Sequence, residues 1–250
     1  MLKLKVMGSS SKGNEYVLQN NKSTIILDCG VKNTKDNVDL QKVDGILITH
    51  QHLWLDHCRD VKDIKNYYQG KFYSNKETLD KLPIIDLYKQ EIESGVLFSI
   101  GTFNIIAFDL MHDVPCYGYL IKDTISNAKI LYITDTGMIN YKFKDIDYYL
   151  IESNCDENDL TYEDYKEVRL YDTHLSMQQT AKFLLKSVNH NTKGIVLCHI
   201  SSSEENYMKH QDYIEKCLNN NKIVVTALDP HLKGEQTIVL KEDIEGFNFE

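Results

Sequence analysis

Residues 49–57, Thr-His-Gln-His-Leu-Trp-Leu-Asp-His, constrain what this chain can fold into more than any other segment. They follow the apolar run 45–48, which is typical of a buried strand, and they precede a segment with helical spacing. Four groups that bind metals stand within eight positions here, namely His50, His52, Asp56 and His57. Imidazole and carboxylate groups together suit Zn²⁺, Mn²⁺ or Fe²⁺. A single histidine in a loop is more often only solvated, but this cluster predicts a site for two adjacent divalent metals.

Further residues of the same chemistry stand at the ends of other expected strands. His112 ends the run 108–111, Asp135 follows residues 131–134, and His199 follows residues 195–198. Asp135 alone, in Asp-Thr-Gly, is more typical of a turn than of a ligand. Side chains at strand tips can converge on one point, however, so the repeated placement predicts that all these residues share one pocket.

Hydrophobic spacing along the chain predicts strands, then helices, then strands, then helices and strands again. Strands are expected at residues 2–7, 16–19, 24–28, 45–49, 96–99, 103–108, 117–121, 129–134, 148–152, 194–198, 222–226 and 236–240. Helices are expected at residues 56–68, 76–82, 157–169, 177–188 and 204–218, with capping boxes Ser176/Gln179 and Ser202/Glu205 before the last two. This order predicts an α/β chain with two sheets sandwiched between helices, and nothing in it asks for more than one domain over residues 1–250.

Charge and apolar patterning exclude two classes of protein. Lys plus Arg is 28 and Asp plus Glu is 37, which gives a formal net charge of −9. That balance excludes a protein whose basic surface wraps around nucleic acid. It does not exclude an enzyme that binds one nucleotide or one strand end through bound metal cations. The chain has no apolar run long enough for a membrane span, and its six cysteines show no paired spacing. We therefore expect free thiols and a cytoplasmic location without membrane contact.

The motifs of the chain resemble those of the metallo-β-lactamase superfamily, whose pattern is His-x-His-x-Asp-His followed by an isolated His, an Asp and a last His. The resemblance covers nearly the whole chain and is greatest to the YycJ-type branch of small nuclease-like proteins. It is carried by residues 8–14 (Gly-Ser-Ser-Ser-Lys-Gly-Asn), 27–30 (Leu-Asp-Cys-Gly), 112–113 (His-Asp), 134–137 (Thr-Asp-Thr-Gly), 152–154 (Glu-Ser-Asn), 174–176 (His-Leu-Ser) and His199.

The resemblance implies a four-layer αββα sandwich with two divalent metal ions, Zn or Mn. One ion is expected on His50, His52 and His112. The other is expected on Asp56, His57 and His199, with Asp135 bridging the two. Asp56 and His174 are the residues to which the resemblance assigns catalysis.

The metal motif departs from the family pattern by a net insertion of two residues. The family has one residue between the second His and the Asp, whereas this chain has Leu53, Trp54 and Leu55. An outward bulge would keep all four ligands in place, and a strand-to-helix loop absorbs extra residues at small entropic cost. The alternatives are a damaged or single-metal site, or a loop in which Trp54 fills a pocket beside the metals.

His174 is the candidate for work beyond metal binding. It precedes the capping box at Ser176, and the N-terminus of a helix attracts anions. In similar nucleases the His at this place contacts the scissile phosphate or gives a proton to the leaving oxygen. The alternative is a surface histidine beside a cap. Residues 201–203, three serines before an expected helix, have the same two interpretations.

The function that follows is metal-dependent hydrolysis of a phosphodiester, with a dinuclear metal-activated hydroxide as the attacking group. Resemblance at His174 and residues 9–14 favours this reaction over hydrolysis of β-lactams, thioesters or lactones. Three hypotheses remain: a nuclease acting on nucleic acid ends, a phosphodiesterase for small cyclic nucleotides of the phage immune-evasion type, and an interaction module that lost its chemistry through the insertion. A homodimer is also left open.

Overall fold

The computed structural model describes residues 1–52, 57–161 and 165–241 of the chain. Its strands form two seven-stranded sheets, in the orders β14-β1-β2-β3-β4-β5-β6 and β13-β12-β11-β10-β9-β8-β7. The strands of the first sheet are β1 Leu2–Ser10, β2 Gly13–Gln19, β3 Thr24–Leu27, β4 Gly45–Leu47, β5 Phe72–Ser74, β6 Lys89–Glu91 and β14 Gln236–Lys241. Those of the second sheet are β7 Leu97–Ile100, β8 Phe103–Leu110, β9 Cys116–Asp123, β10 Lys129–Ile133, β11 Tyr148–Glu152, β12 Gly194–Cys198 and β13 Val224–Ala227.

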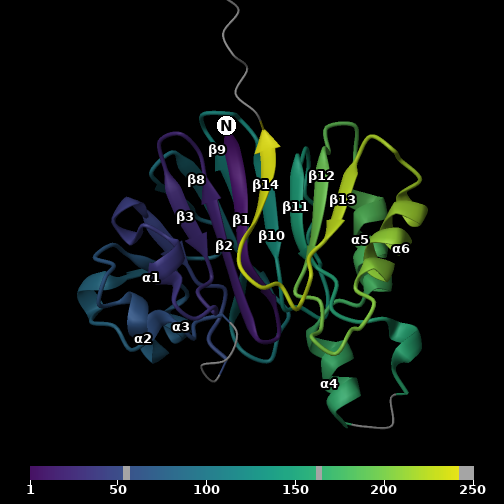
Figure 1. Ribbon diagram of the computed structural model, residues 1–250, viewed down its shortest axis with the longest axis horizontal. Coiled ribbons are helices and arrows are strands. Elements are labelled where there is room, and N and C mark those ends of the chain that lie inside the picture. Colours follow the sequence, from purple (N-terminus) through teal and green to yellow (C-terminus); the bar gives the residue numbers. More distant parts are fainter. Residues whose placement is uncertain (53–56, 162–164, 242–250) are drawn as a thin grey trace, which may run out of the picture.

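Helices cover the outer face of each sheet. The helices among the described residues are α1 Thr34–Asn37, α2 Val61–Ile64, α3 Lys76–Lys81, α4 Tyr165–Thr173, α5 Met177–Ser187 and α6 Met208–Leu218, with short 3-10 turns at Leu40–Lys42, Asp86–Tyr88 and Glu157–Asp159. Helix α4 lies beyond the ends of the strands (Figure 1). In Figure 1, α1, α2 and α3 lie on one side of the strands and α5 and α6 on the other. The expected four-layer αββα sandwich is confirmed.

Three apolar clusters hold these four layers together. Leu4 and Tyr16 of the first sheet meet Ile105 and Tyr119 of the second in the central cluster. The other two clusters lie under the helices, one between the first sheet and α2 and α3, the other between the second sheet and α5 and α6. Alternate residues of one strand therefore serve different layers: Tyr132 of β10 packs between the sheets, while its neighbours Leu131 and Ile133 pack under the helices.

The direction of the strands determines which edge of each sheet carries the functional loops. In the first sheet β3, β4 and β5 are parallel neighbours, and in the second β10, β11, β12 and β13 are parallel neighbours. The carboxyl ends of parallel strands lie at the same edge, so the loops after them are brought together.

The predicted elements are recovered, but three helices differ from their expected extent. The helix expected at 56–68 is confined to α2, because the Asp60 carboxylate accepts hydrogen bonds from the backbone N–H groups of Asn33 and Thr34 and so ties this turn to another loop. The helix expected at 157–169 is split into a 3-10 turn and α4. In the part of it that is described, Thr161 donates from its N–H and hydroxyl to Glu167.

The helix expected at 204–218 begins four residues later, and the capping box predicted for it is wrong. The N-cap of α6 is Tyr207, which makes no side-chain capping bond. The Glu204 carboxylate instead pairs with Lys209 at 2.9 Å, so a tertiary ion pair replaces the local cap. The box at Ser176 and Gln179 is confirmed, with both reciprocal hydrogen bonds present. The short strands β5 and β6 were not expected, since they carry no clear alternation.

Candidate metal centre

The residues singled out as ligands lie at the carboxyl ends of strands from both sheets. His50 and His52 follow β4, His112 follows β8, Asp135 follows β10 and His199 follows β12. His57 lies between the His50 loop and α2. The structure brings these six side chains into one region, between the edges of the two sheets. Asp56 and the inserted residues 53–55 lie outside the described residues.

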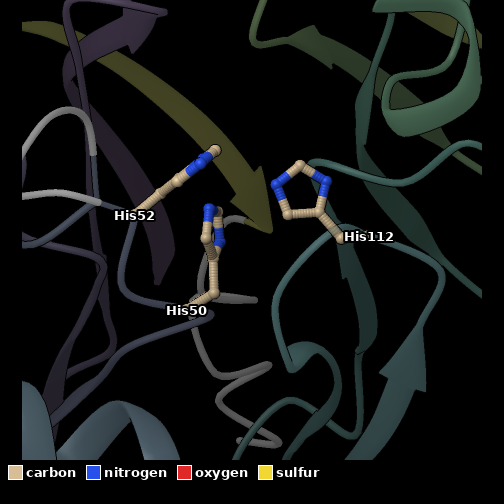
Figure 2. A group of neighbouring side chains, drawn as sticks. All are labelled: His50, His52 and His112. Carbon is tan, nitrogen blue, oxygen red and sulfur yellow. The ribbon is translucent and has the colours of Figure 1, made fainter. Parts of the chain in front are cut away.

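His50, His52 and His112 form the first group of close donors. One ring nitrogen of each lies within 4.8 Å of the others, and the ring centroids of His50 and His112 are 4.8 Å apart. Figure 2 shows that His50 and His52 come from one loop and that His112 faces them from the opposite side. The backbone oxygen of Thr173 accepts a hydrogen bond from Nδ1 of His112 at 3.1 Å, which leaves Nε2 as the nitrogen that can bind a metal.

His50, His57 and Asp135 form a second group. Nε2 of His57 lies 3.1 Å from Oδ1 of Asp135, and Nε2 of His50 lies 3.9 Å from Oδ2. The opposite nitrogen of His57, Nδ1, lies 2.8 Å from the buried carboxylate of Asp28. Asp28 also accepts from Thr49 and from the hydroxyl of Tyr132, so it is held rigidly while it orients His57.

Glu152, the last residue of β11, joins two histidines in a third group. Its Oε1 lies 2.7 Å from Nδ1 of His174 and 2.7 Å from Nδ1 of His199. Its Oε2 accepts the backbone N–H groups of Leu175 and Thr136. Glu152 is fully buried. Both of its oxygens are occupied by these contacts, and the carboxylate fixes the two histidine rings that face Asp135.

Charge interactions inside this cluster shift the pKa values in opposite directions. Burial would raise the pKa of Asp135, but the charges of His199, His57 and His174 outweigh it and hold the pKa well below its usual range. Burial lowers the pKa of His112, which favours the neutral imidazole that binds a metal. Burial would also lower the pKa of His174, but Glu152 and Asp135 outweigh it and raise this pKa. Between these two histidines, His174 is therefore the one suited to hold a proton.

An ion pair that the sequence did not predict lies beside His52 at one side of the cluster. Arg169 of α4, one of only two arginines in the chain, donates from Nε to Oδ2 of Asp113 at 3.1 Å, and its terminal nitrogen lies 3.3 Å from Nε2 of His52. Asp113 also lies 3.1 Å from Nε2 of His112. Burial would raise the pKa of Asp113, but Arg169 together with His112 and His52 lowers it. Helix α4 thus reaches the cluster through the side chain of Arg169 as well as through the backbone oxygen of Thr173.

The N-terminal hairpin also contacts the cluster. Ser9 Oγ accepts the backbone N–H of His199 at 2.9 Å, and the side-chain nitrogen of Asn14 lies 3.4 Å from Nε2 of His57. Ser9 and Asn14 belong to β1 and β2, so both strands extend beyond their expected ranges of 2–7 and 16–19. Of the three serines at 201–203, Ser201 and Ser203 bond to each other at 2.8 Å and none caps a helix.

The donor set fits divalent metals of the Zn, Mn or Fe type. Imidazole nitrogens and one carboxylate converge from the described residues, and most of these side chains are buried or nearly so. Three of the seven non-glycine residues with positive φ among the described residues lie here, at Asp28 (58°), Asp135 (23°) and His199 (50°). Such backbone strain is tolerated where the surrounding bonds over-determine it, and it gathers at functional sites.

Comparison with known proteins assigns the family. A family model described as the beta-lactamase superfamily domain matches residues 24–200. The chain belongs to this family. Solved structures share the fold of this chain. The metallo-β-lactamase fold protein YhfI of Bacillus subtilis superposes with a TM-score of 0.70 at 15% identity, over 94% of this chain and 99% of that one. Human tRNase Z, short form, superposes with a TM-score of 0.65 at 17% identity, over 96% of this chain and all of that one.

One relative is more similar in sequence than these solved structures. The exodeoxyribonuclease WalJ of Streptococcus pneumoniae is 29% identical over 232 residues, which is 83% of this chain and 84% of that protein. The predicted resemblance to the superfamily is therefore confirmed.

Four residues of the centre were not assigned a role from the sequence: Asp28, Asp113, Glu152 and Arg169. Asp28, Asp113 and Glu152 lie in motifs that carry the resemblance, and Arg169 is marked only by the rarity of arginine in this chain. His210 is also buried, and its Nδ1 lies 2.8 Å from Ser153 Oγ.

Proposed function

We propose that this protein hydrolyses phosphodiester bonds with two divalent metal ions at the centre described above, and that it does so as a nuclease. The observation that carries the proposal is the convergence of His50, His57, Asp135 and His199 beside a buried Glu152 that also holds His174. The 29% identical exodeoxyribonuclease supports the choice of a phosphodiester over other substrates of the superfamily.

The proposed ligands are divided between two ions as the family pattern implies. His50, His52 and His112 hold one, and His57 and His199 with Asp56 hold the other, while Asp135 contributes to both. Bound there, divalent ions of the Zn or Mn type supply a water of lowered pKa and neutralise the phosphoryl oxygens. The first set is supported by the separation of its ring nitrogens, each of which lies within 4.8 Å of the others. The second set is supported by Oδ1 of Asp135, which lies 3.1 Å from Nε2 of His57 and 3.3 Å from Nδ1 of His199.

The proton transfer belongs to His174. Its Nδ1 donates to Glu152, which stabilises the protonated ring and aims Nε2 away from the carboxylate. When the bond from phosphorus to the leaving oxygen breaks, that oxygen takes the proton from Nε2 of His174. Glu152 acts as a positioning residue, because it touches His174 and His199 and has no exposed surface for a substrate.

We also propose that the protein works in the cytoplasm. All six cysteines are free and five of them are buried, which suits a reducing compartment. None of the described helices has the length and apolar character needed to cross a bilayer.

The test combines metal content with turnover. Protein purified without added metal or chelator is expected to carry two equivalents of Zn or Mn by elemental analysis and to hydrolyse bis(p-nitrophenyl) phosphate. Asp135→Asn should lower kcat by at least about a hundredfold with an unchanged circular dichroism spectrum, because a neutral amide is a poor bridge between cations. His190→Ala, at an exposed position, is the control and should match the parent.

A second variant tests the positioning role. Glu152→Gln should lower metal affinity or activity by about 10–100-fold. Fewer than one metal equivalent in the parent, with no turnover after metal is added, would overturn the proposal and favour the hypothesis of an interaction module.

A further inference from the structure

A cavity of about 820 Å³ lies beside the metal centre, between the segment that follows β10 and the outer face of α5. Its walls come from residues 137–144, from Leu175, Gln178, Lys182 and Lys186 at α5, and from Tyr171 of α4. Nothing in the proposed chemistry uses this cavity.

The cavity is lined by residues that stand next to the centre in the sequence. Gly137 lines it and stands two residues after Asp135, so the two Cα atoms are no more than about 7.6 Å apart. Leu175, on the other wall, follows His174 directly. A Cβ added to Gly137 would lie 1.9 Å from the backbone oxygen of Asp172, so α4 packs tightly against this wall. The cavity is therefore separated from the centre by two positions of chain on one wall and by one position on the other.

Four lysines make the cavity cationic in a chain whose net charge is −9. Lys142 and Lys144 lie on one wall, and Lys182 and Lys186, one helical turn apart, lie on α5. None of the four has a carboxylate within 4.0 Å among the described residues, whereas exposed lysines of α3 pair with Asp80 and Glu77. Glu157, the acidic residue of the lining, already accepts a hydrogen bond from Ser176 Oγ at 2.6 Å. Four unpaired cations around one hollow favour a polyanion as its occupant.

Aromatic rings accompany the charge. Tyr141 is 41% exposed, and its ring centroid lies 5.2 Å from that of Phe108 and 6.0 Å from that of Phe143. Tyr171 is half-buried on the α4 wall. A ring held by neighbouring rings, with part of its surface in solvent, is the platform on which nucleic-acid bases stack.

We propose that this cavity binds the nucleotides next to the scissile phosphate of a single polynucleotide strand, with the four lysines on its phosphates and Tyr141 against a base. The inference rests on the proposed function, which it deepens by naming a strand as the substrate. A cyclic mononucleotide has one phosphate, which the metal centre would take, and it would leave the four lysines without a partner. An acidic polypeptide would meet the lysines but would have no base for Tyr141.

Binding of an uncut strand tests the cavity independently of hydrolysis. In an Asp135→Asn background, fluorescence anisotropy with a labelled twelve-nucleotide thymidine strand should show affinity that falls with salt. The pair Lys182→Ala/Lys186→Ala should weaken binding about tenfold at low salt and reduce the slope of log K against log salt by about 1.4, since each phosphate contact on a single strand contributes about 0.7.

The control removes the same charge elsewhere. Lys122→Ala/Lys222→Ala changes two exposed lysines: Lys122 faces the first residue of β10, and Lys222 precedes β13, so both lie at the sheet edge opposite the metal centre. This pair should bind the strand as the background does. Lys142→Ala/Lys144→Ala provides a second test from the other wall, should the α5 pair disturb the helix.

Turnover separates the cavity from the centre. In the metal-loaded parent sequence, the α5 pair should lower kcat/KM on DNA or RNA strands about tenfold and leave kcat/KM on bis(p-nitrophenyl) phosphate unchanged. Three results would each overturn the cavity proposal. The α5 pair could lose kcat/KM equally on both substrates, or it could bind the strand with the same affinity and salt slope as the control pair. Polyglutamate could also compete with the labelled strand as well as an unlabelled strand does. Failure to hydrolyse any phosphodiester would overturn the proposed function but leave the binding measurement to decide the cavity.

Discussion

At the scale of single residues, the centre depends on carboxylates that contact histidines from behind. Asp28 bonds Nδ1 of His57, and Glu152 bonds Nδ1 of both His174 and His199. A buried carboxylate fixes which ring nitrogen carries the proton and in which direction the other nitrogen points. The chemistry of the other ring nitrogen of each histidine is therefore set by a buried carboxylate that has no surface for a substrate.

Glu15 is a buried carboxyl outside the centre, and its pKa predicts how stability changes with pH. It has no exposed surface, its Oε2 accepts a hydrogen bond from Thr34 at 2.6 Å, and burial raises its pKa to about 8. In the unfolded chain this carboxyl ionises near its ordinary pKa of 4.5, while in the folded chain it keeps its proton. Between these values the unfolding free energy therefore falls as pH rises, by about 1.4 kcal/mol per pH unit from this group, and the loss is complete above pH 8.

Glu15→Gln removes that dependence, because an amide does not ionise. The stability of the variant relative to the parent should rise by about 1.4 kcal/mol per unit between pH 5 and 8, measured by urea unfolding at each pH. The exposed Glu205→Gln is the control and should run parallel to the parent. Parallel curves for Glu15→Gln would show that Glu15 is ionised in the folded protein.

At the scale of elements, caps explain where sequence patterns sufficed and where they did not. The box at Ser176 and Gln179 was predictable because both partners lie within one turn of the helix they cap. The same pattern at Ser202 and Glu205 was misleading, since Glu204 pairs with Lys209 and α6 begins at Met208. A local pattern holds only when no tertiary partner takes its groups.

The cap of α5 carries a stability prediction. Ser176 Oγ accepts the N–H of Gln179 at 3.0 Å and donates to Glu157 at 2.6 Å. Ser176→Ala removes both bonds and should lower the unfolding free energy by about 1–2 kcal/mol, seen as a lower urea midpoint at constant slope. Ser94→Ala, in an exposed turn, should stay within about 0.5 kcal/mol of the parent. Equal effects of the two substitutions would show that the box does not stabilise α5.

At the scale of the whole molecule, two tyrosines of the second sheet bond groups of the first. Tyr132 donates to the carboxylate of Asp28 at 2.6 Å, and Tyr119 donates to the backbone oxygen of Ile48 at 2.6 Å. Both rings are fully buried between the sheets. Since Asp28 orients His57, the contact between the sheets and the geometry of the centre depend on the same bond.

This pair offers a matched comparison of a charged and a neutral acceptor. Tyr132→Phe should cost about 1.5–3 kcal/mol of unfolding free energy, whereas Tyr119→Phe should cost about 0.5–1.5 kcal/mol, because hydrogen bonds to charged groups contribute more. Urea unfolding measures both. Tyr132→Phe should also lower metal content, since it loosens Asp28, and Tyr119→Phe should not. The reverse order of costs would contradict the inferred role of Asp28.

The sequence by itself determined the layers and the chemical types at the strand ends. Alternating apolar residues and capping patterns act over a few positions, so most strands and helix α5 were predictable. His50, His52, His57, His112, Asp135 and His199 were predictable as a set because each follows a strand or its loop. The route of the insertion at residues 53–55 was not, and it lies outside the described residues.

Only the tertiary structure decided which groups support the centre and what lies next to it. Glu152 meets His174 and His199 across 22 and 47 positions of sequence, and Arg169 meets Asp113 across 56. The cationic cavity joins lysines of the segment after β10 to lysines of α5 in a chain whose overall charge is negative. Sequence periodicity reports only neighbours within a strand or a helical turn, whereas these contacts arise from the packing of the two sheets and their helices.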